Sequence, residues 1–264
     1  MLRKLNSLMR RFSYNHHATV WRAFRSHSVE SCIAVTIGIG PRYYRLAALA
    51  AQRCAWATDL PTFLITHSAM KDFPHIKSAH QIKFHLFDLF PEAESILFFD
   101  SDAMFLRKQR FDSYFGSPYF TSVLDAENKW SIEDSGLVGV PLTSYFNSGF
   151  FIASRRYHAP MFLRASQLAQ IPVPSILRDQ GFLNRARLEL DVPLRSLPRK
   201  FNAVSFDPES DKDTIIAHVS GVAWDSAKLL LLPPNHSDIK RANLSLPDRQ
   251  HCARVICSPK GRLP

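Results

Sequence analysis

The chain has 264 residues, of which 46% are hydrophobic and 21% charged, an ordinary composition for a globular protein with a sizeable core. Its formal net charge is +10, but residues 1–30 and 240–264 each carry a net +5, so residues 31–239 are neutral overall. No apolar run approaches the roughly 18 residues that a membrane-spanning helix needs. These properties argue against a membrane-spanning chain and against nucleic acid as the specific partner of the folded body.

The charge distribution predicts a basic N-terminal tail over 1–30, one folded domain over 31–232 and a basic C-terminal tail over 233–264. The first tail can place apolar residues on one helical face, and such a segment suits peripheral binding to an anionic membrane surface. A disordered basic leader or a transit peptide explains its composition equally well. The apolar residues in question are Leu2, Leu5, Met9 and Phe12.

The four cysteines show no disulfide-type spacing, and nothing at the start of the chain reads as a secretory signal. Both observations favour free thiols in a reducing compartment, so we expect a cytoplasmic protein, with or without peripheral membrane contact.

Apolar, β-rich runs alternate with helical patterns along the chain. In order, the sequence predicts a strand at 33–37, a helix at 42–58, a strand at 63–66, a helix at 82–90, strands at 96–99, 120–123 and 146–153, helices at 159–169 and 179–188, and a strand at 214–218. This alternation predicts a single α/β domain with a mostly parallel, doubly wound sheet flanked by helices. Ligands of such sheets bind at the carboxyl ends of the strands, so the residues that follow each strand are the candidates for function.

Two carboxylates follow the most apolar strand, in Asp100-Ser101-Asp102. In extended chain they point the same way and can bind one hard cation such as Mn²⁺ or Mg²⁺. A turn or a helix cap is the alternative, since Asp and Ser are common in both. His218 also ends an apolar strand, where it can complete such a metal site or serve as a structural histidine.

Polar residues interrupt another apolar run at Asn147-Ser148-Gly149. Gly149 permits close backbone approach to a ligand, and Asn147 offers both a donor and an acceptor. A β-bulge without a ligand is the alternative interpretation.

Three further positions carry open alternatives. Asp179 and Gln180 begin a predicted helix, where they can face a sugar ring or Asp179 can serve as the N-cap. Lys83 can reach substrate phosphates, although its place on a helix favours a solvated charge. Tyr43 follows a Gly-containing turn, where it can stack on a nucleobase or pack in the core.

The ordered motifs resemble GT-A fold glycosyltransferases, most closely the retaining enzymes of glycosyltransferase family 8, which include glycogenin and bacterial lipopolysaccharide galactosyltransferases. Four motifs match the family's pattern in order: Phe99-Asp100-Ser101-Asp102, Phe146-Asn147-Ser148-Gly149, Asp179-Gln180 with Leu183-Asn184, and His218-Val219-Ser220-Gly221. The resemblance covers about 33–224 and implies a GT-A domain within residues 31–232.

By this resemblance, Asp100, Asp102 and His218 hold Mn²⁺ (or Mg²⁺) on the diphosphate of a nucleotide-sugar donor, expected to be a UDP-sugar. The acceptor is expected to be a glycan or a lipid-linked sugar. Asp179 and Gln180 are the expected catalytic residues, and the donor is expected to contact Asp125, Asn147, Ser148, Gly149, Lys83, Tyr43 and Gly221.

One departure concerns the family's Lys-Pro-Trp after His-x-x-Gly, because this chain has Val222-Ala223-Trp224 and the next lysine is Lys228. A related GT-A family that shares the aspartate triplet fits nearly as well. A sugar-nucleotide nucleotidyltransferase, and a basic non-catalytic membrane or nucleic-acid adaptor, are the alternatives from other classes.

Overall fold

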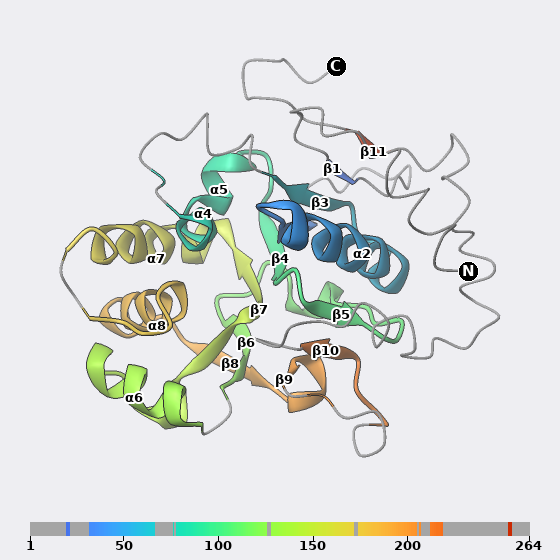
Figure 1. The fold of residues 1–264 in the computed structure, drawn as a ribbon. Coiled ribbons are helices and arrows are strands. Elements are labelled where there is room, and N and C mark those ends of the chain that lie inside the picture. Colours follow the sequence, from blue (N-terminus) through green and yellow to red (C-terminus); the bar gives the residue numbers. More distant parts are fainter. Residues whose placement is uncertain are drawn as a thin grey trace.

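The computed structural model describes residues 20–21, 32–66, 76, 78–125, 128–171, 174–204, 206, 212–218 and 253–254. At its centre is a six-stranded sheet in the order β3-β2-β4-β7-β6-β8 (Figure 1). Only β7 runs antiparallel to its neighbours, and the other pairs are parallel, so the mixed, mostly parallel sheet predicted from the sequence is confirmed. The strands are β2 (Cys32–Ile37), β3 (Thr62–Ile65), β4 (Ser95–Phe99), β6 (Phe120–Leu124), β7 (Phe146–Ser154) and β8 (Leu194–Leu197).

A smaller sheet lies beside the first one, in the order β5-β10-β9. Its strands are β5 (Ala103–Phe105), β9 (Ala203–Val204) and β10 (Ile216–His218). The antiparallel pairing of β10 with β5 sets His218 opposite Ala103, directly after the aspartate triplet. A separate pair joins β1 (Val20–Trp21) to β11 (Ala253–Arg254), one short segment from each predicted tail.

Helices cover both faces of the main sheet (Figure 1). α2 (Pro41–Thr58) packs on one face, beside β5. The other face carries α4 (Ala79–Ile82), α5 (Leu86–Leu89), α7 (Arg155–Leu168) and α8 (Asp179–Glu189). α6 (Lys129–Val138) packs against α8. Short 3₁₀ turns are η1 (Lys83–His85), η2 (Asp112–Tyr114), η3 (Leu142–Ser144) and η4 (Arg199–Phe201).

The alternation of side chains along β4 divides the core in two. Leu97 and Phe99 face the α2 side, whereas Phe98 faces the α7 side, where its ring stacks on Phe151 at 4.9 Å. All are fully buried, and each buried side chain of this size contributes about 1.5–3 kcal/mol. The core thus fixes the end of β4, from which the aspartate triplet emerges.

Some predicted boundaries were wrong. The helix predicted at 82–90 is divided into α4, η1 and α5, and the strand predicted at 214–218 pairs only from Ile216. The helix predicted from 159 begins at Arg155, with Pro160 inside it, because the His158 ring accepts a hydrogen bond from the Ser154 N–H at 2.7 Å and so satisfies a donor at the helix start.

Candidate active site

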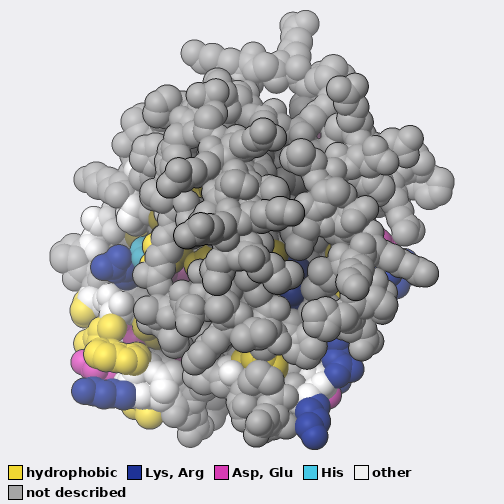
Figure 2. Space-filling view, turned by 45° about the vertical axis from the view of Figure 1, so that its right-hand side comes forward, with side chains coloured by type: hydrophobic (Ala, Val, Ile, Leu, Met, Phe, Trp, Pro, Cys, Tyr) yellow, Lys and Arg dark blue, Asp and Glu magenta, His cyan; other side chains and the backbone are white. Residues whose placement is uncertain are grey.

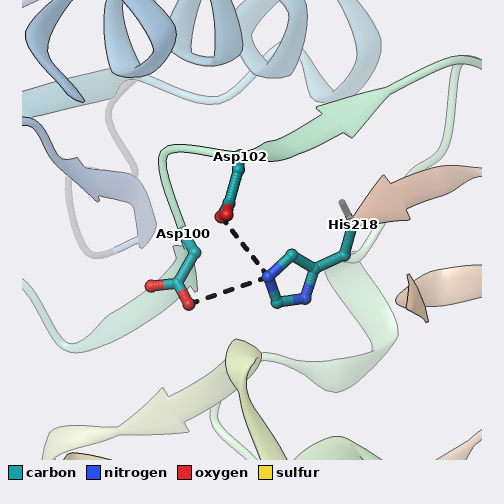
Figure 3. A group of neighbouring side chains, drawn as sticks. All are labelled: Asp100, Asp102 and His218. Atoms are coloured by element: carbon teal, nitrogen blue, oxygen red, sulfur yellow. Dashed lines mark ion pairs between the residues drawn. The ribbon is translucent and has the colours of Figure 1, made fainter. Parts of the chain in front are cut away.

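Three potential metal ligands converge where the two sheets meet (Figure 3). His218 Nε2 lies 3.3 Å from Asp102 Oδ1 and 4.0 Å from Asp100 Oδ2. One ligand atom from each residue lies within 4.8 Å of the other two. Two carboxylate oxygens and one imidazole nitrogen form a donor set that suits Mn²⁺ or Mg²⁺, so the residues present fit the cation that the sequence predicted.

Gly149 of β7 forms the floor beneath the histidine. A Cβ atom added to Gly149 would lie 2.2 Å from Cε1 and 2.7 Å from Nδ1 of His218, which is too close for any side chain. Nδ1 itself is buried and has no hydrogen-bond partner among the residues that the structure describes. Only glycine at this position lets the imidazole reach the two aspartates.

Burial and the neighbouring charges shift the pKa values of Asp100 and His218. Burial raises the pKa of Asp100, Lys83 opposes this effect, and the Asp102 carboxylate adds to it. Burial alone would lower the pKa of His218, but the hydrogen bond and the charge of Asp102 outweigh it, so the pKa is raised. Adjacent carboxylates at the end of a buried strand repel each other, and a cation between them would relieve this repulsion.

Lys83 is buried, with 5% of its surface exposed, so the interpretation as a solvated helix charge is wrong. Its Nζ lies 2.9 Å from Asp100 Oδ1 and 2.7 Å from Asp179 Oδ2, and it donates to Ser148 at 3.3 Å. Burial alone would lower the pKa of this amine, but the two carboxylates outweigh it and raise the pKa. Lys83 thus joins the aspartate triplet to α8.

An irregularity in β7 aims its polar residues at the site. The register against β6 shifts between Ser122 and Leu124, which leaves residues 147–150 of β7 out of regular pairing with β6. The Ser122 hydroxyl lies 3.0 Å and 2.7 Å from the carbonyl oxygens of Asn147 and Phe150, and can donate to either. The predicted bulge is therefore present, and it faces the cluster rather than standing apart from it.

A hydrogen-bonded network extends from this bulge to α8. Asn147 Nδ2 donates to Asp125 Oδ1 at 3.0 Å, and Gln180 Nε2 donates to Asp125 Oδ2 at 2.8 Å. Gln180 Oε1 accepts from the Ser148 N–H at 3.0 Å. Four predicted site residues from three separate chain segments are thus brought together with fixed amide orientations.

Asp179 is the first residue of α8, and Arg178 occupies the N-cap position without a side-chain hydrogen bond, so the interpretation of Asp179 as the N-cap is wrong. Its carboxylate instead contacts Lys83, the Ser148 hydroxyl at 2.9 Å and His80 Nδ1 at 2.8 Å. Burial alone would raise the pKa of Asp179, but Lys83 and His80 outweigh it and lower the pKa.

One predicted site residue lies apart from this network, and another falls outside the described residues. Tyr43 lies near the start of α2 with 51% of its surface exposed, and Gly221 lies outside the described residues. The sequence reasoning also missed two residues of the network, His80 and Asn202. Asn202 Nδ2 donates to Asn147 Oδ1 at 2.9 Å. A lone Asn in Lys200-Phe201-Asn202 carries no pattern that could have revealed this contact.

The face drawn in Figure 2 shows no single basic field among the described residues. On the face in Figure 2, the visible Lys and Arg side chains lie in separate groups with acidic side chains close to them. Within the described part of the chain, no helix is long and apolar enough to cross a membrane.

No family model matches the chain, and no curated protein sequence matches it. Solved structures do. The galactosyltransferase LgtC in complex with donor and acceptor sugar analogues aligns with a TM-score of 0.51 and 15% identity over 79% of this chain and 99% of that one. A glycosyltransferase involved in glycosylating the major capsid of PBCV-1 aligns with a TM-score of 0.52 and 15% identity over 73% and 94%.

The bifunctional glycosyltransferase WbbM, in its apo form, aligns with a TM-score of 0.52 and 11% identity over 76% of this chain. The present chain spans only 47% of that longer protein. These likenesses show that the chain has the GT-A fold of known glycosyltransferases, as the ordered sequence motifs implied.

Proposed function

We propose that this protein is a Mn²⁺- or Mg²⁺-dependent glycosyltransferase that moves a hexose from a nucleotide sugar, expected to be a UDP-sugar, to a glycan or lipid-linked acceptor. The observation that carries the proposal is the meeting of a metal-ligand cluster and a polar network at one edge of the sheet. Asp100 follows β4 and Asp125 follows β6, and Asn147 lies near the start of β7, which is antiparallel to both. All three therefore lie at the edge where ligands of such sheets bind.

In this proposal Asp100, Asp102 and His218 hold the cation. When bound, it would neutralise the charge that develops on the departing nucleoside diphosphate. Lys83 adds a fixed positive charge on the sugar side of the same cluster, between Asp100 and Asp179. A buried cation that is already oriented stabilises developing negative charge without rearrangement.

The sugar is proposed to lie against Asp125, Asn147, Asp179 and Gln180. Asp179 is a weak candidate for a nucleophile, because Lys83, Ser148 and His80 all contact its carboxylate and Lys83 and His80 lower its pKa. We therefore propose that Asp179 and Gln180 position and stabilise the sugar in an oxocarbenium-like transition state. Retention of the anomeric configuration remains an expectation from the family resemblance.

A panel of nucleotide sugars, incubated with Mn²⁺ and scored for nucleoside diphosphate release, tests this function. We expect release from one donor or a few related donors, and its loss in Asp102→Ala. Release of pyrophosphate from a nucleoside triphosphate and a sugar phosphate would instead favour the nucleotidyltransferase. If no donor is turned over although circular dichroism shows an intact fold, the proposal is wrong.

We further propose that the basic tails bring the enzyme to a membrane that carries a lipid-linked acceptor, in a cytoplasmic setting. Both tails lie mainly outside the described residues, and the proposal rests on the amphipathic pattern of residues 1–30. Deletion of residues 1–28 should abolish co-sedimentation with liposomes that contain anionic lipid. Unchanged co-sedimentation of the truncated protein would contradict this role.

A further inference from the structure

A buried carboxylate outside the proposed metal site lies behind the sugar-facing end of α8. Asp134 of α6 has no exposed surface, and no Lys, Arg or His of the described part of the chain forms an ion pair with it. A buried carboxylate without a cation is costly unless hydrogen bonds satisfy its oxygens. Its partners therefore indicate what it holds in place.

Four donors surround Asp134. Oδ2 accepts from the Tyr145 hydroxyl, and Oδ1 accepts from the Ser175 hydroxyl at 2.9 Å and from the Leu177 N–H at 3.1 Å. The Ile176 N–H also donates to Oδ1. One donor comes from the residue just before β7 and three from the segment just before α8, so Asp134 ties together the two segments that carry the polar network.

The segment that Asp134 holds is strained and closely packed. Arg178, which precedes Asp179, has φ 51° and ψ −108°, a conformation that residues other than glycine rarely adopt. A Cβ atom on Gly181 would lie 2.3 Å from Ser175 Oγ and 2.5 Å from Asp134 Oδ2. Strain of this kind persists only where the surroundings enforce it, and Asp134 bonds to the three residues directly before Arg178.

Leu177 connects Asp134 to Gln180, because its N–H donates to Asp134 Oδ1 and its carbonyl oxygen accepts from the Gln180 N–H at 3.2 Å. Burial raises the pKa of the Tyr145 hydroxyl, as does its hydrogen bond to Asp134, so this hydroxyl remains a donor to the carboxylate. Tyr145 leads directly into β7, whose Ser148 N–H donates to Gln180 Oε1 at 3.0 Å. Asp134 therefore holds the backbone on both sides of the Gln180 side chain.

We propose that Asp134, acting through Tyr145 and the 175–177 segment, is a positioning residue that holds Gln180 and the first turn of α8 against the sugar. The inference rests on the proposed function and deepens it. Asp134 touches neither the metal ligands nor the sugar-facing atoms. Its loss should therefore affect the sugar-dependent step and leave the binding of nucleotide and metal intact.

The test compares Asp134→Asn and Tyr145→Phe with Tyr157→Phe, a change of the same kind at an exposed tyrosine of α7. In Asp134→Asn the new side chain can still accept from the 175–177 segment, but its amide N–H₂ cannot accept from the Tyr145 hydroxyl, so the bond to the residue before β7 is lost. We expect kcat for the best donor of the panel to fall about 10- to 100-fold in both variants, as misplacement by about 1 Å does elsewhere. The Kd for UDP with Mn²⁺ should stay within about twofold of the wild-type value.

Parallel losses of UDP affinity and kcat, or unchanged kcat in Tyr145→Phe, would show that Asp134 is only structural and would overturn the inference. If Asp134→Asn fails to fold, Tyr145→Phe and Ser175→Ala carry the test, because each removes a single donor to Asp134.

A second readout separates this inference from the proposed function. The side-chain amide signals of Gln180 in a ¹⁵N NMR spectrum should shift in Asp134→Asn and Tyr145→Phe but not in Tyr157→Phe. If the wild type turns over no nucleotide sugar, the proposed function fails, and the Gln180 signals still decide whether Asp134 positions this residue. Unmoved Gln180 signals in both variants would reject it.

Discussion

At the scale of single residues, Asp100 illustrates how the site divides its contacts. Its Oδ1 lies 2.9 Å from Lys83 Nζ, while its Oδ2 faces His218 Nε2 at 4.0 Å. One oxygen is therefore held by a fixed ammonium, and the other is directed at the position proposed for the cation. Asp102, 3.3 Å from the same imidazole nitrogen, completes the set.

Asp102→Asn should weaken Mn²⁺ binding sharply, because an amide oxygen replaces a charged ligand. The loss should exceed the roughly 10- to 100-fold that removing an outer partner of a metal ligand costs. Free Mn²⁺ measured by EPR during a titration gives the affinity directly. Asp112→Asn, at an exposed carboxylate of η2, is the matched control and should bind as the wild type does. Equal affinity in Asp102→Asn and wild type would contradict the metal assignment.

Gly149→Ala leaves all three proposed ligand side chains in the sequence. It should nevertheless displace His218, since the new methyl would lie 2.2 Å from the imidazole. We expect a loss of about 1–3 kcal/mol in the free energy of unfolding, together with weaker Mn²⁺ binding. Denaturant unfolding and the EPR titration measure the two effects. Gly136→Ala, on the exposed face of α6 with no atom within 4 Å of the added Cβ, should leave binding unchanged. Normal Mn²⁺ affinity in Gly149→Ala would show that the imidazole is not a ligand.

The sequence predicted the residue types of the site better than their surroundings. Asp100 and Asp102 follow an apolar strand and His218 ends another, and this pattern is visible without a structure. The burial of Lys83 was not, because it depends on carboxylates 17 and 96 positions away that only folding brings together.

At the scale of elements, the His158 ring links α7 to the sheet through two hydrogen bonds. Its Nδ1 accepts from the Ser154 N–H at the end of β7, and Nε2 lies 3.1 Å from the Pro118 carbonyl oxygen ahead of β6. This arrangement requires a neutral ring, with the proton on Nε2. Burial lowers the pKa of His158 from 6.5 to about 4, and the ring therefore resists protonation in the folded state.

Acid should therefore weaken the fold through His158. Above pH 6.5 the ring is neutral in both states and contributes no pH dependence. As the pH falls from 6.5 to about 4, the His158 ring becomes protonated in the unfolded chain but stays neutral in the folded chain. The free energy of unfolding therefore falls by about 3 kcal/mol over this range. Urea unfolding of the wild type and His158→Gln at a series of pH values isolates this component. If the two proteins lose stability in parallel over this range, the assignment is wrong.

The strained turn before α8 gives a second prediction at this scale. Arg178→Ala keeps the unfavourable φ of 51°, whereas Arg178→Gly removes it, and both lose the same side chain. We expect the glycine variant to be more stable than the alanine variant by about 1 kcal/mol. At Arg164, in the interior of α7, the order should reverse, since glycine is less favourable than alanine in a helix by about 1 kcal/mol. Thermal unfolding measures both pairs, and the same order at both sites would contradict the strain.

The sequence predicted the elements that have a strong apolar pattern. It did not predict the short strands that form only by pairing with distant segments. β4 and β7 are continuous apolar runs, and the sequence located both to within one residue. β5, β8 and β9 are short and become strands only by pairing with distant partners. α6 has little apolar period, although the capping box between Asn128 and Ser131 could have revealed its start.

At the scale of the whole molecule, the fold brings four separate chain segments to one edge of the sheet. Asp100 follows β4, Asp125 follows β6, Asn147 lies near the start of β7, and His218 ends β10 of the smaller sheet. The antiparallel direction of β7 is essential, because a parallel β7 would begin at the opposite edge. The order of motifs in the sequence indicated the fold, but neither this strand order nor the pairing of β10 with β5 can be read from local patterns.

The dependence of nucleoside diphosphate release on Mn²⁺ tests the central claim most directly. With the best donor of the panel, release by the wild type should rise with Mn²⁺ to saturation and vanish when a chelator is in excess. Asp102→Asn should show no saturable response over the same range, while Asp112→Asn follows the wild type. Full release in the presence of chelator, or an unchanged Mn²⁺ response in Asp102→Asn, would show that Asp100, Asp102 and His218 do not form the metal centre of this reaction.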